Sequence, residues 1–287
     1  MGKRKQLKDA DGDAHMGDNN QNDSSDEDMD IVNVDFEWFD PQPDHDFHGM
    51  KILLRQLFDN DAQNFDLSAL TDLILSQPLL GSTVKTEGNE SDPYAFLTVL
   101  NLQEHKDKPV IQSLTKYVSQ KASQAHLAPL QSLLSQSPIP AIGLILTERL
   151  INIPAEVVPP MYTMLQEEIQ WALDEGEPYS FTHYLIVSRK YQEVTSKLDE
   201  EDNRPQKKKK AAGQKKETYP FHPEDDILKN FAVCAGDYDW SHEAPEGASD
   251  SKRAFHEWGI KTMGHMILIE AAKFEAAVNA MKEAFSP

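Results

Sequence analysis

Hydrophobic and polar residues alternate along the chain with the period of a strand in some segments and of a helix in others. Residues 32–38 alternate apolar and polar side chains, which predicts a strand that ends before Pro41. Apolar residues spaced by three and four then predict two helices, at 50–58 and 67–74. Asp66 is the expected N-cap of the second helix, because its side chain can accept a hydrogen bond from the first turn.

The same two periods predict further strands and helices as far as the C-terminus. Strands are expected at residues 82–87, 94–102, 141–146, 179–187, 227–234 and 263–269, and helices at 110–118, 127–134, 161–172 and 274–285. The first two of these strands flank a turn-rich link and form a predicted hairpin. The continuous apolar run at 141–146 is typical of a strand buried on both faces. The order of elements predicts an α/β fold, a mixed and mostly antiparallel sheet with helices on both faces.

The charged residues divide the chain into a tail and a domain. The 287 residues carry 48 acidic and 28 basic side chains, a net charge of −20, and the stretch from Asp9 to Asp46 has fourteen acids without one Lys or Arg. Residues 1–30 lack the apolar side chains that a core needs, so we expect a disordered acidic tail with a basic N-terminus. Residues 31–287 are expected to form one domain of only moderate acidity. The acidic balance disfavours direct binding to nucleic acid or to an anionic membrane.

A second charged segment interrupts the predicted domain. Four acids at 199–202 are followed by Arg204 and by a run of lysines at 207–210, with a proline and a glycine nearby. This composition predicts an exposed acidic and basic loop at about residues 199–217. Strand-like sequence resumes after it, so we expect the loop to be an insertion within the domain.

No pattern of residues predicts a catalytic, cofactor-binding or metal site. The chain lacks the glycine-rich phosphate loops and the nucleophile and zinc motifs of common enzymes. Its one cysteine, Cys234, indicates a reducing compartment, and within an apolar strand such a thiol is typically inert. His45 and His48 could ligate a metal together with a carboxylate, but capping of the first helix explains this segment better. Asp225 and Asp226 carry no signal of burial, so an acid/base role has no support.

Two apolar patterns have both a packing and a functional interpretation. Met161 with Met164, and Met263 with Met266, could line a binding groove, although methionine more often fills a core. The leucines at 67, 70, 73 and 75 have the spacing of a nuclear export signal, which an amphipathic helix also produces. Packing is the favoured interpretation of both patterns.

The tail and the lysine runs suggest a basic protein partner and transport into the nucleus. A segment too polar to fold that carries many acids can attract a Lys- and Arg-rich protein and keep it from adhering to RNA. The candidates for contact with such a client are Asp23, Asp26, Glu27, Asp28 and Asp30. Ser24 and Ser25 precede acids and are candidates for phosphorylation. The candidate nuclear-import residues are Lys3, Arg4 and Lys5, and Lys207, Lys208, Lys209 and Lys210.

Four segments of the chain resemble one known family. They read VDFEWFDP at 34–41, DFHGMK at 46–51, GLILTERLINIP at 143–154 and FTHYL at 181–185. The third is the most specific, and its family-motif residues are Glu148, Arg149, Asn152 and Pro154. On these segments the chain is similar to the BCCIP family, in its fungal branch, from about Ile31 to the C-terminus.

The resemblance implies a nuclear, non-enzymatic protein. Animal members of the family bind a recombination-repair tumour suppressor and a cyclin-dependent-kinase inhibitor. Fungal members act in large-subunit biogenesis, as the chaperone of the basic ribosomal protein of the intersubunit face, and in nuclear export of a lipid kinase. By this resemblance we expect a chaperone or escort that uses import and export receptors and shuttles between nucleus and cytoplasm, mainly nuclear. A regulatory scaffold in DNA repair or cell-cycle control is a less favoured alternative.

The resemblance also implies a fold similar to the GNAT acetyltransferases, without their activity. Those enzymes bind the pyrophosphate of coenzyme A on a glycine-containing loop at the start of a helix. The stretch that we expect to correspond to it, Asn101 to Leu114, contains no glycine. A helix start without the close backbone approach that glycine permits is a poor phosphate site, so we expect no cofactor. The fold similarity nevertheless leaves a second alternative from a different functional class, a degenerate or active acyltransferase.

Overall fold

The structure is a computed structural model that describes residues 34–77, 80–194, 217–243 and 259–285. The chain divides into two compact units, Met1–Val34 and Asp35–Pro287, and every helix and strand described below belongs to the second. The predicted acidic tail lies outside the described residues. So does the predicted charged loop, apart from Glu217.

Strands and helices interleave in the predicted order, except that β6 and α7 were not predicted. The strands are β1 (Glu37–Phe39), β2 (Ser82–Lys85), β3 (Ala95–Asn101), β4 (Ile142–Arg149), β5 (His183–Glu193), β6 (Thr218–Pro220), β7 (Ala232–Tyr238) and β8 (Ile260–Glu270). The helices are α1 (Pro43–Phe58), α2 (Leu67–Leu75), α3 (Pro109–Gln124), α4 (Ala128–Leu134), α5 (Val158–Asp174), α7 (Glu224–Lys229) and α9 (Ala271–Ala284). Two 3-10 turns, η1 (Asp59–Asn64) and η2 (Ala155–Val157), complete the elements.

The strands form one mixed sheet in the order β1-β2-β3-β4-β5-β8-β7, and β6 pairs with the far end of β5. Every neighbouring pair is antiparallel except β4 and β5, which are parallel and are joined through α5. The predicted hairpin is confirmed, because β2 pairs antiparallel with β3. The predicted fold class, a mixed and mostly antiparallel sheet in an α/β fold, is likewise confirmed.

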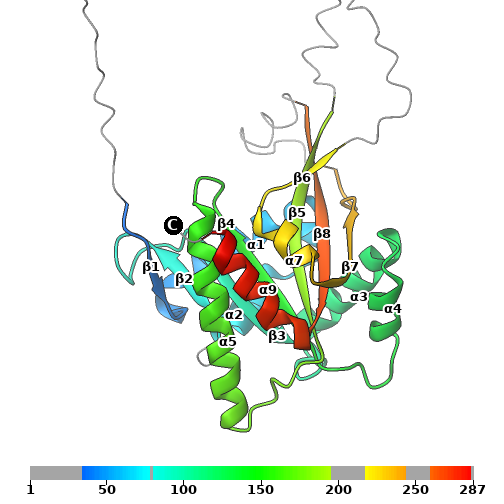
Figure 1. The fold of residues 1–287 in the computed structure, drawn as a ribbon, viewed down its shortest axis with the longest axis horizontal. Helices are drawn as coiled ribbons and strands as arrows, with labels where there is room; N and C mark the ends of the chain where they lie inside the picture. Colours follow the sequence, from blue (N-terminus) through cyan, green and yellow to red (C-terminus); the bar gives the residue numbers. More distant parts are fainter. Residues whose placement is uncertain (1–33, 78–79, 195–216, 244–258, 286–287) are drawn as a thin grey trace, which may run out of the picture. The chain divides into compact units, whose positions relative to one another are not determined.

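Helices cover both faces of the sheet. Figure 1 shows α5, α7 and α9 over one face, and α1, α2, α3 and α4 pack into a separate core on the other. Strand β4 contributes to both cores, because Leu144 and Leu146 lie in the core with α1, α2, α3 and α4, while Ile145 lies in the core with α5 and α9. All three side chains are fully buried. The apolar run at 141–146 is therefore a central strand covered on both faces, as predicted.

The starts of the first two helices are fixed by side chains that the sequence suggests. In α1, Pro43 occupies the first turn, and the Asp46 carboxylate accepts a hydrogen bond from the Gln42 backbone N–H at 2.7 Å. In α2, the side chain of Asp66 accepts from the Ala69 N–H at 3.0 Å, so the predicted N-cap is confirmed. Both contacts satisfy N–H groups that have no partner within the helix.

Two predicted strands differ from the structure, and one observed strand was not predicted. The strand expected at 32–38 is shorter among the described residues and comprises only Glu37–Phe39. The strand expected at 227–234 is wrong in its first half, since residues 224–229 form α7 and β7 starts at Ala232. Three acids in the first turn and a preceding proline favour a helix start there. The strand β6 is too short for its alternation to be recognised in the sequence.

The methionine and leucine patterns are explained by packing. Met161 and Met266 are buried in the two cores, Met263 is buried on β8, and Met164 is partly buried. The leucines at 67, 70, 73 and 75 are also buried, so in this fold they are not available to an export receptor. Within the described ranges, no helix is both long and apolar enough to cross a lipid bilayer.

Candidate functional site

The two parallel strands separate at their carboxyl ends and leave a wedge between them. Their pairing runs from Ile142 and His183 to Leu146 and Val187. Beyond this point β4 continues beside β3 as far as Arg149, while β5 continues beside β8. The carboxyl ends of parallel strands are where open α/β sheets bind ligands, so this wedge is the first place to look for a site.

Buried charged side chains fill the wedge. Glu148 on β4 accepts a hydrogen bond from Arg189 Nε on β5 at 2.7 Å and lies 2.9 Å from His222 Nε2. Arg149 forms a two-pronged ion pair with Glu224 of α7, with 3.0 Å between Nη2 and Oε2. All five side chains are buried. We call this group of five the wedge network.

The charges in the wedge network set each other's protonation states. Burial alone would raise the pKa of Glu148, but Arg189 and His222 outweigh it and hold that pKa below its ordinary value. Burial would lower the pKa of His222, but the neighbouring carboxylates, Glu148 foremost, raise it instead. Glu148 is therefore ionised and His222 favours its charged form. Each acid already has a buried basic partner, so neither carboxylate is a free general base.

A second buried carboxylate lies beside the wedge network. Asp225 accepts a hydrogen bond from Ser188 Oγ at 2.5 Å, and burial raises its pKa to about 6 despite the opposing charge of His222. No signal of burial is recognised in the sequence at either Asp225 or Asp226; in the structure Asp225 is buried and Asp226 is exposed. Position 225 faces inward because residues 224–229 form a helix rather than a strand, and that error hid the signal.

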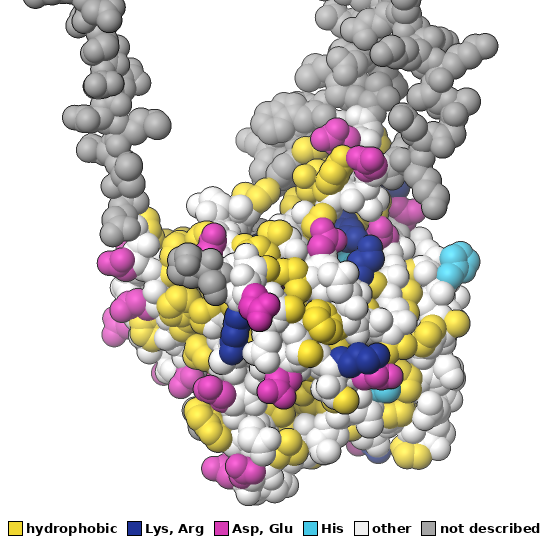
Figure 2. Space-filling view, viewed as in Figure 1, with side chains coloured by type: hydrophobic (Ala, Val, Ile, Leu, Met, Phe, Trp, Pro, Cys, Tyr) yellow, Lys and Arg dark blue, Asp and Glu magenta, His cyan; other side chains and the backbone are white. Residues whose placement is uncertain are grey.

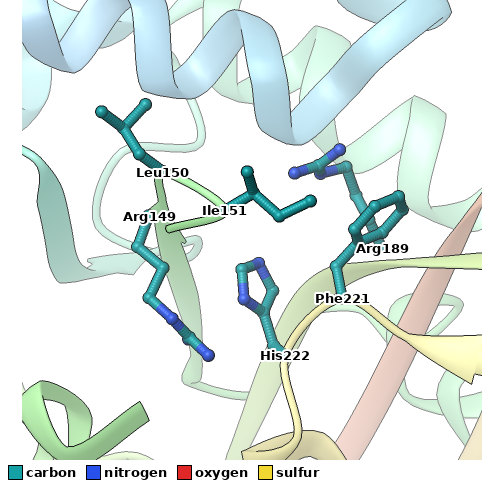
Figure 3. Close-up of a pocket in the computed structure, with 6 residues that line it drawn as sticks. All are labelled: Arg149, Leu150, Ile151, Arg189, Phe221 and His222. Atoms are coloured by element: carbon teal, nitrogen blue, oxygen red, sulfur yellow. The ribbon is translucent and has the colours of Figure 1, made fainter. Parts of the chain in front are cut away.

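The opening of the wedge is a small pocket with a charged floor (Figure 3). It is lined by Arg149, Leu150, Ile151, Arg189, Phe221 and His222 and has room for about one water molecule. The Arg189 guanidinium lies over the Phe221 ring, 4.6 Å from its centre, and Ile151 at the rim is 73% exposed. The wedge is thus occupied by the protein's own side chains, and its ion pairs join β4, β5 and α7.

The helix that starts at the carboxyl end of β4 is a poor phosphate site. The sequence interpretation placed the corresponding loop before α3, but the helix that links the two parallel strands is α5. The loop from residue 150 to 157 contains no glycine, and Pro159 and Pro160 in the first turn of α5 have no N–H to donate. Anion binding at a helix start depends on those N–H groups. This geometry argues against a coenzyme A pyrophosphate at α5.

The other candidate residues do not assemble into a site. His45 and His48 are exposed, while Asp46 between them is buried, caps α1 and pairs with Lys85 at 2.6 Å. In the part of the chain that the structure describes, no three His, Cys, Asp or Glu side chains are arranged to hold a metal ion. Burial raises the pKa of the Cys234 thiol, as expected of an inert cysteine. Of the family-motif residues, Glu148 and Arg149 are in the wedge network, whereas Asn152 and Pro154 are exposed after β4.

The predicted residues outside the described ranges are those of the tail and the lysine runs. They are Lys3, Arg4, Lys5, Asp23, Ser24, Ser25, Asp26, Glu27, Asp28, Asp30, Lys207, Lys208, Lys209 and Lys210. Their roles in client contact, phosphorylation and import stay predictions.

The folded part is far more acidic than the sequence interpretation held. The described residues include 32 acids and 14 bases, a net charge of −18, whereas residues 1–30 carry nine acids and four bases. The fourteen-acid stretch was assigned wholly to the tail, but its last five acids, from Asp35 to Asp46, belong to the folded unit. Burial adds to the effect, since five bases lie in buried ion pairs: Lys85, Lys121, Arg149, Arg189 and Lys190. Among the described residues, 25 acids and nine bases are not buried.

One buried acid away from the wedge gives a test of pH-dependent stability. Glu168 on α5 accepts a hydrogen bond from the Gly81 N–H at 2.7 Å, and burial raises its pKa to about 7, with Asp40 and Glu167 adding to the shift. A raised carboxyl pKa favours folding below the ordinary value of 4.5, and this contribution is lost as the pH rises through 7.

We expect Glu168→Gln to raise the melting temperature by a few degrees at pH 8 and to have a much smaller effect near pH 4.5. The glutamine oxygen can still accept from Gly81, so only the charge is removed. Calorimetric melting curves across this range measure the difference, with the exposed Glu156→Gln as the control. An equal shift at both pH values would contradict the assignment.

Comparisons with known proteins agree with one another. The BCCIP family model matches residues 31–228. Protein bcp1 of Emericella nidulans is 67% identical over 291 residues, covering 100% of this chain and 99% of that protein. Protein bcp1 of Schizosaccharomyces pombe is 48% identical over 266 residues, 90% of this chain and 92% of that protein. The crystal structure of BCP1 from Saccharomyces cerevisiae matches with a TM-score of 0.58 and 28% identity, covering 91% and 92% of the two chains. None of these names is that of an enzyme, and the chain belongs to the BCCIP family.

Proposed function

We propose that the protein is a non-enzymatic chaperone and escort for a basic protein of the large ribosomal subunit, the universal one of the intersubunit face. In this proposal it supports large-subunit biogenesis, acts mainly in the nucleus, and serves nuclear export of clients that include a lipid kinase. Family membership is the starting point of this proposal. The observation that carries it is the strongly acidic surface of the folded part, with 25 acids and nine bases outside the buried set.

The physical argument concerns what such a surface can bind. A ribosomal protein has a basic surface that adheres to RNA, and in the free protein nothing neutralises it. A folded acidic surface competes with RNA for that charge and steers the client by long-range attraction. A folded acidic surface also has fixed geometry, so it can select one basic client, which an unstructured acidic segment does less well.

The acyltransferase alternative is less favoured on two grounds. The helix start at α5 lacks both glycine and two of its N–H donors, which a pyrophosphate would need. The wedge network fills the ends of the parallel strands with paired charges, and its pocket has room for about one water molecule. A coenzyme would have to displace buried ion pairs to enter.

Co-expression with the ribosomal protein of the intersubunit face tests the proposal. The client is expected to stay in the supernatant and to release bound RNA when the protein is present, and to aggregate or stay on RNA without it. Equal aggregation with and without the protein would overturn the proposal.

A variant without residues 1–30 separates the tail from the domain in the same assay. Because the domain holds most of the negative charge, we expect the variant to keep most of its chaperone effect and to weaken mainly at low salt. Exposed charges are screened beyond about 8 Å at physiological ionic strength. A complete loss of the effect would place client binding in the tail instead.

A further inference from the structure

An exposed aromatic side chain, Trp171, lies in the last turn of α5. Trp171 is 59% exposed, while the other described tryptophans, Trp38 and Trp240, are each partly buried and donate a hydrogen bond through the indole N–H. Burying a tryptophan ordinarily stabilises a fold, so an indole that lies mostly in water on a regular helix contributes little to the free energy of unfolding of this domain. Exposed tryptophans are common at the centres of protein interfaces.

Carboxylates surround Trp171 on the same helix. Glu167 lies one turn before it, and Asp174 and Glu175 lie one turn after it, all of them exposed. Positions three and four apart share one face of a helix, so these carboxylates flank the indole. Gln170 Nε2 donates to the Asp174 carboxylate at 3.0 Å and helps to hold it in place. No Lys or Arg occurs anywhere in the sequence of α5.

The position of these acids on the helix is unfavourable for stability. The last turn of a helix presents unpaired carbonyls and a partial negative charge, which basic side chains normally offset. Here Asp174, Glu175 and Glu177 crowd that end, and Gly176, with φ of 84°, terminates the helix between them. The end of β3 also contacts the segment after this helix, because Asn101 Nδ2 donates to the Pro178 carbonyl. A cation from outside the domain would supply the missing compensation.

The space-filling view agrees with this arrangement. Figure 2 shows acidic side chains interspersed with hydrophobic surface over the region where Figure 1 draws the lower half of α5. The loop before α3 brings two acids, Glu104 and Asp107, and two bases, Lys106 and Lys108, so it adds no net charge. The charge of Glu104 acts together with Glu177 and with burial to raise the pKa of Tyr179.

We propose that the C-terminal turn of α5, namely Trp171 with Glu167, Asp174 and Glu175, is a docking surface for an arginine- or lysine-rich segment of a partner protein. An arginine guanidinium stacks on the indole and keeps its N–H groups directed at carboxylates beside the ring. This inference rests on the proposed function and deepens it, since it gives the basic client a specific point of contact. Among the described residues, the other large apolar side chains that are more than half exposed, Ile52 and Ile151, offer no aromatic face to a cation.

The test uses the full chain and a fluorescently labelled ribosomal protein of the intersubunit face, with binding followed by anisotropy at two salt concentrations. We expect Trp171→Ala to weaken binding by about 30-fold, the effect of losing a central interface tryptophan. Trp171→Phe keeps an aromatic face and should stay within a few-fold of the wild type. Both variants should melt like the wild type, because the side chain is exposed.

Charge variants distinguish binding to this specific surface from attraction to the acidic surface in general. The triple variant Glu167→Gln, Asp174→Asn, Glu175→Gln should weaken binding at least tenfold at low salt and flatten its salt dependence. The matched control neutralises three exposed acids of the β2–β3 turn, Glu87→Gln, Glu90→Gln and Asp92→Asn, and should change binding by less than about threefold. Ile151→Ala is the apolar control for Trp171→Ala.

The outcomes distinguish this inference from the proposed function. If the wild type does not bind the ribosomal protein, the proposed function fails and this inference fails with it. If the wild type binds and Trp171→Ala binds equally well, the function is kept and the docking surface is wrong. Equal losses from the two triple variants would also overturn the inference, because they would mean that acidity over the whole surface, rather than α5, holds the client.

Discussion

Replacement of Glu148 by alanine is expected to lower the free energy of unfolding by about 3–5 kcal/mol, because it removes one partner from a buried ion network. Arg189 loses its 2.7 Å hydrogen bond and His222 loses its 2.9 Å ion pair. Arg189 then stays buried without a counter-charge, and His222 keeps only the more distant Glu224, which lies 4.0 Å from its Nδ1. Urea unfolding at pH 7 measures the loss as a lower midpoint at an unchanged slope.

Two further variants make this result interpretable. Glu148→Gln keeps the shape of the side chain and one acceptor oxygen, so it should lose less stability than alanine. Glu156→Ala removes an exposed acid from the neighbouring turn and should change stability by no more than about 0.5 kcal/mol. A Glu148→Ala protein as stable as the Glu156→Ala protein would mean that the wedge network does not hold β4, β5 and α7 together.

The Glu148→Ala variant should also change how the free energy of unfolding depends on pH. The pKa of Glu148 is lowered by folding, so its contribution is present above the ordinary value of 4.5 and is lost as the pH falls. The pKa of His222 is raised by folding, so its contribution is present below 6.5 and is lost as the pH rises through the folded value. The two contributions coexist fully between about pH 4.5 and 6.5. Without Glu148 this maximum should flatten, and an unchanged profile would contradict the ionisation states assigned here.

Most of the fold could be predicted because long periodic segments determine their own structure. Even the short apolar run at 141–146 could be assigned, because it follows Pro138 and Pro140 and has the length of a strand rather than of a helix, and β4 is that strand. The segment at 227–234 is different, since a short apolar run fits a helix and a strand equally well. There the acids and the proline before Ile227 favour the start of a helix, and the chain becomes extended, as β7, only after Asn230.

The wedge network could not be predicted, because its contacts depend on which strands become neighbours. Glu148 and Arg189 are 41 residues apart, and Arg149 and Glu224 are 75 apart. Nothing in the local sequence records that β4 and β5 are parallel and then separate, which is what brings these side chains together. The family resemblance identified Glu148 and Arg149 as motif residues, but their partners could be identified only once the pairing of the strands was known. Trp171 gave no signal at all, because at the sequence level it fits the apolar face of α5.

Replacement of Asp61 by alanine is the second change expected to be severe, at about 3–5 kcal/mol, on the opposite face of the sheet. This fully buried carboxylate lies in η1 and receives Lys121 Nζ at 2.9 Å and the Tyr117 hydroxyl at 3.1 Å, both from α3. Its other oxygen accepts from the backbone N–H groups of Ser241 and His242, just after β7. One side chain therefore joins three segments that are far apart in the sequence.

The alanine variant should have a local signature as well as a global one. Hydrogen exchange at the Ser241 and His242 amides should accelerate, because their acceptor is gone, while the β4 and β5 amides should follow the global stability. Asp61→Asn keeps an acceptor for those amides but leaves Lys121 without a counter-charge, so it should protect the amides and still destabilise the domain.

The double variant Asp61→Asn, Lys121→Met decides between the two causes of this loss. Removing both charges of a buried pair is often close to neutral, whereas removing one is not. We therefore expect the double variant to recover much of the stability lost in Asp61→Asn, a coupling that a double-mutant cycle measures directly. If the double variant is no more stable than Asp61→Asn, the cost comes from the lost hydrogen bond geometry around Tyr117 rather than from an unpaired lysine, and the charge argument fails for this site.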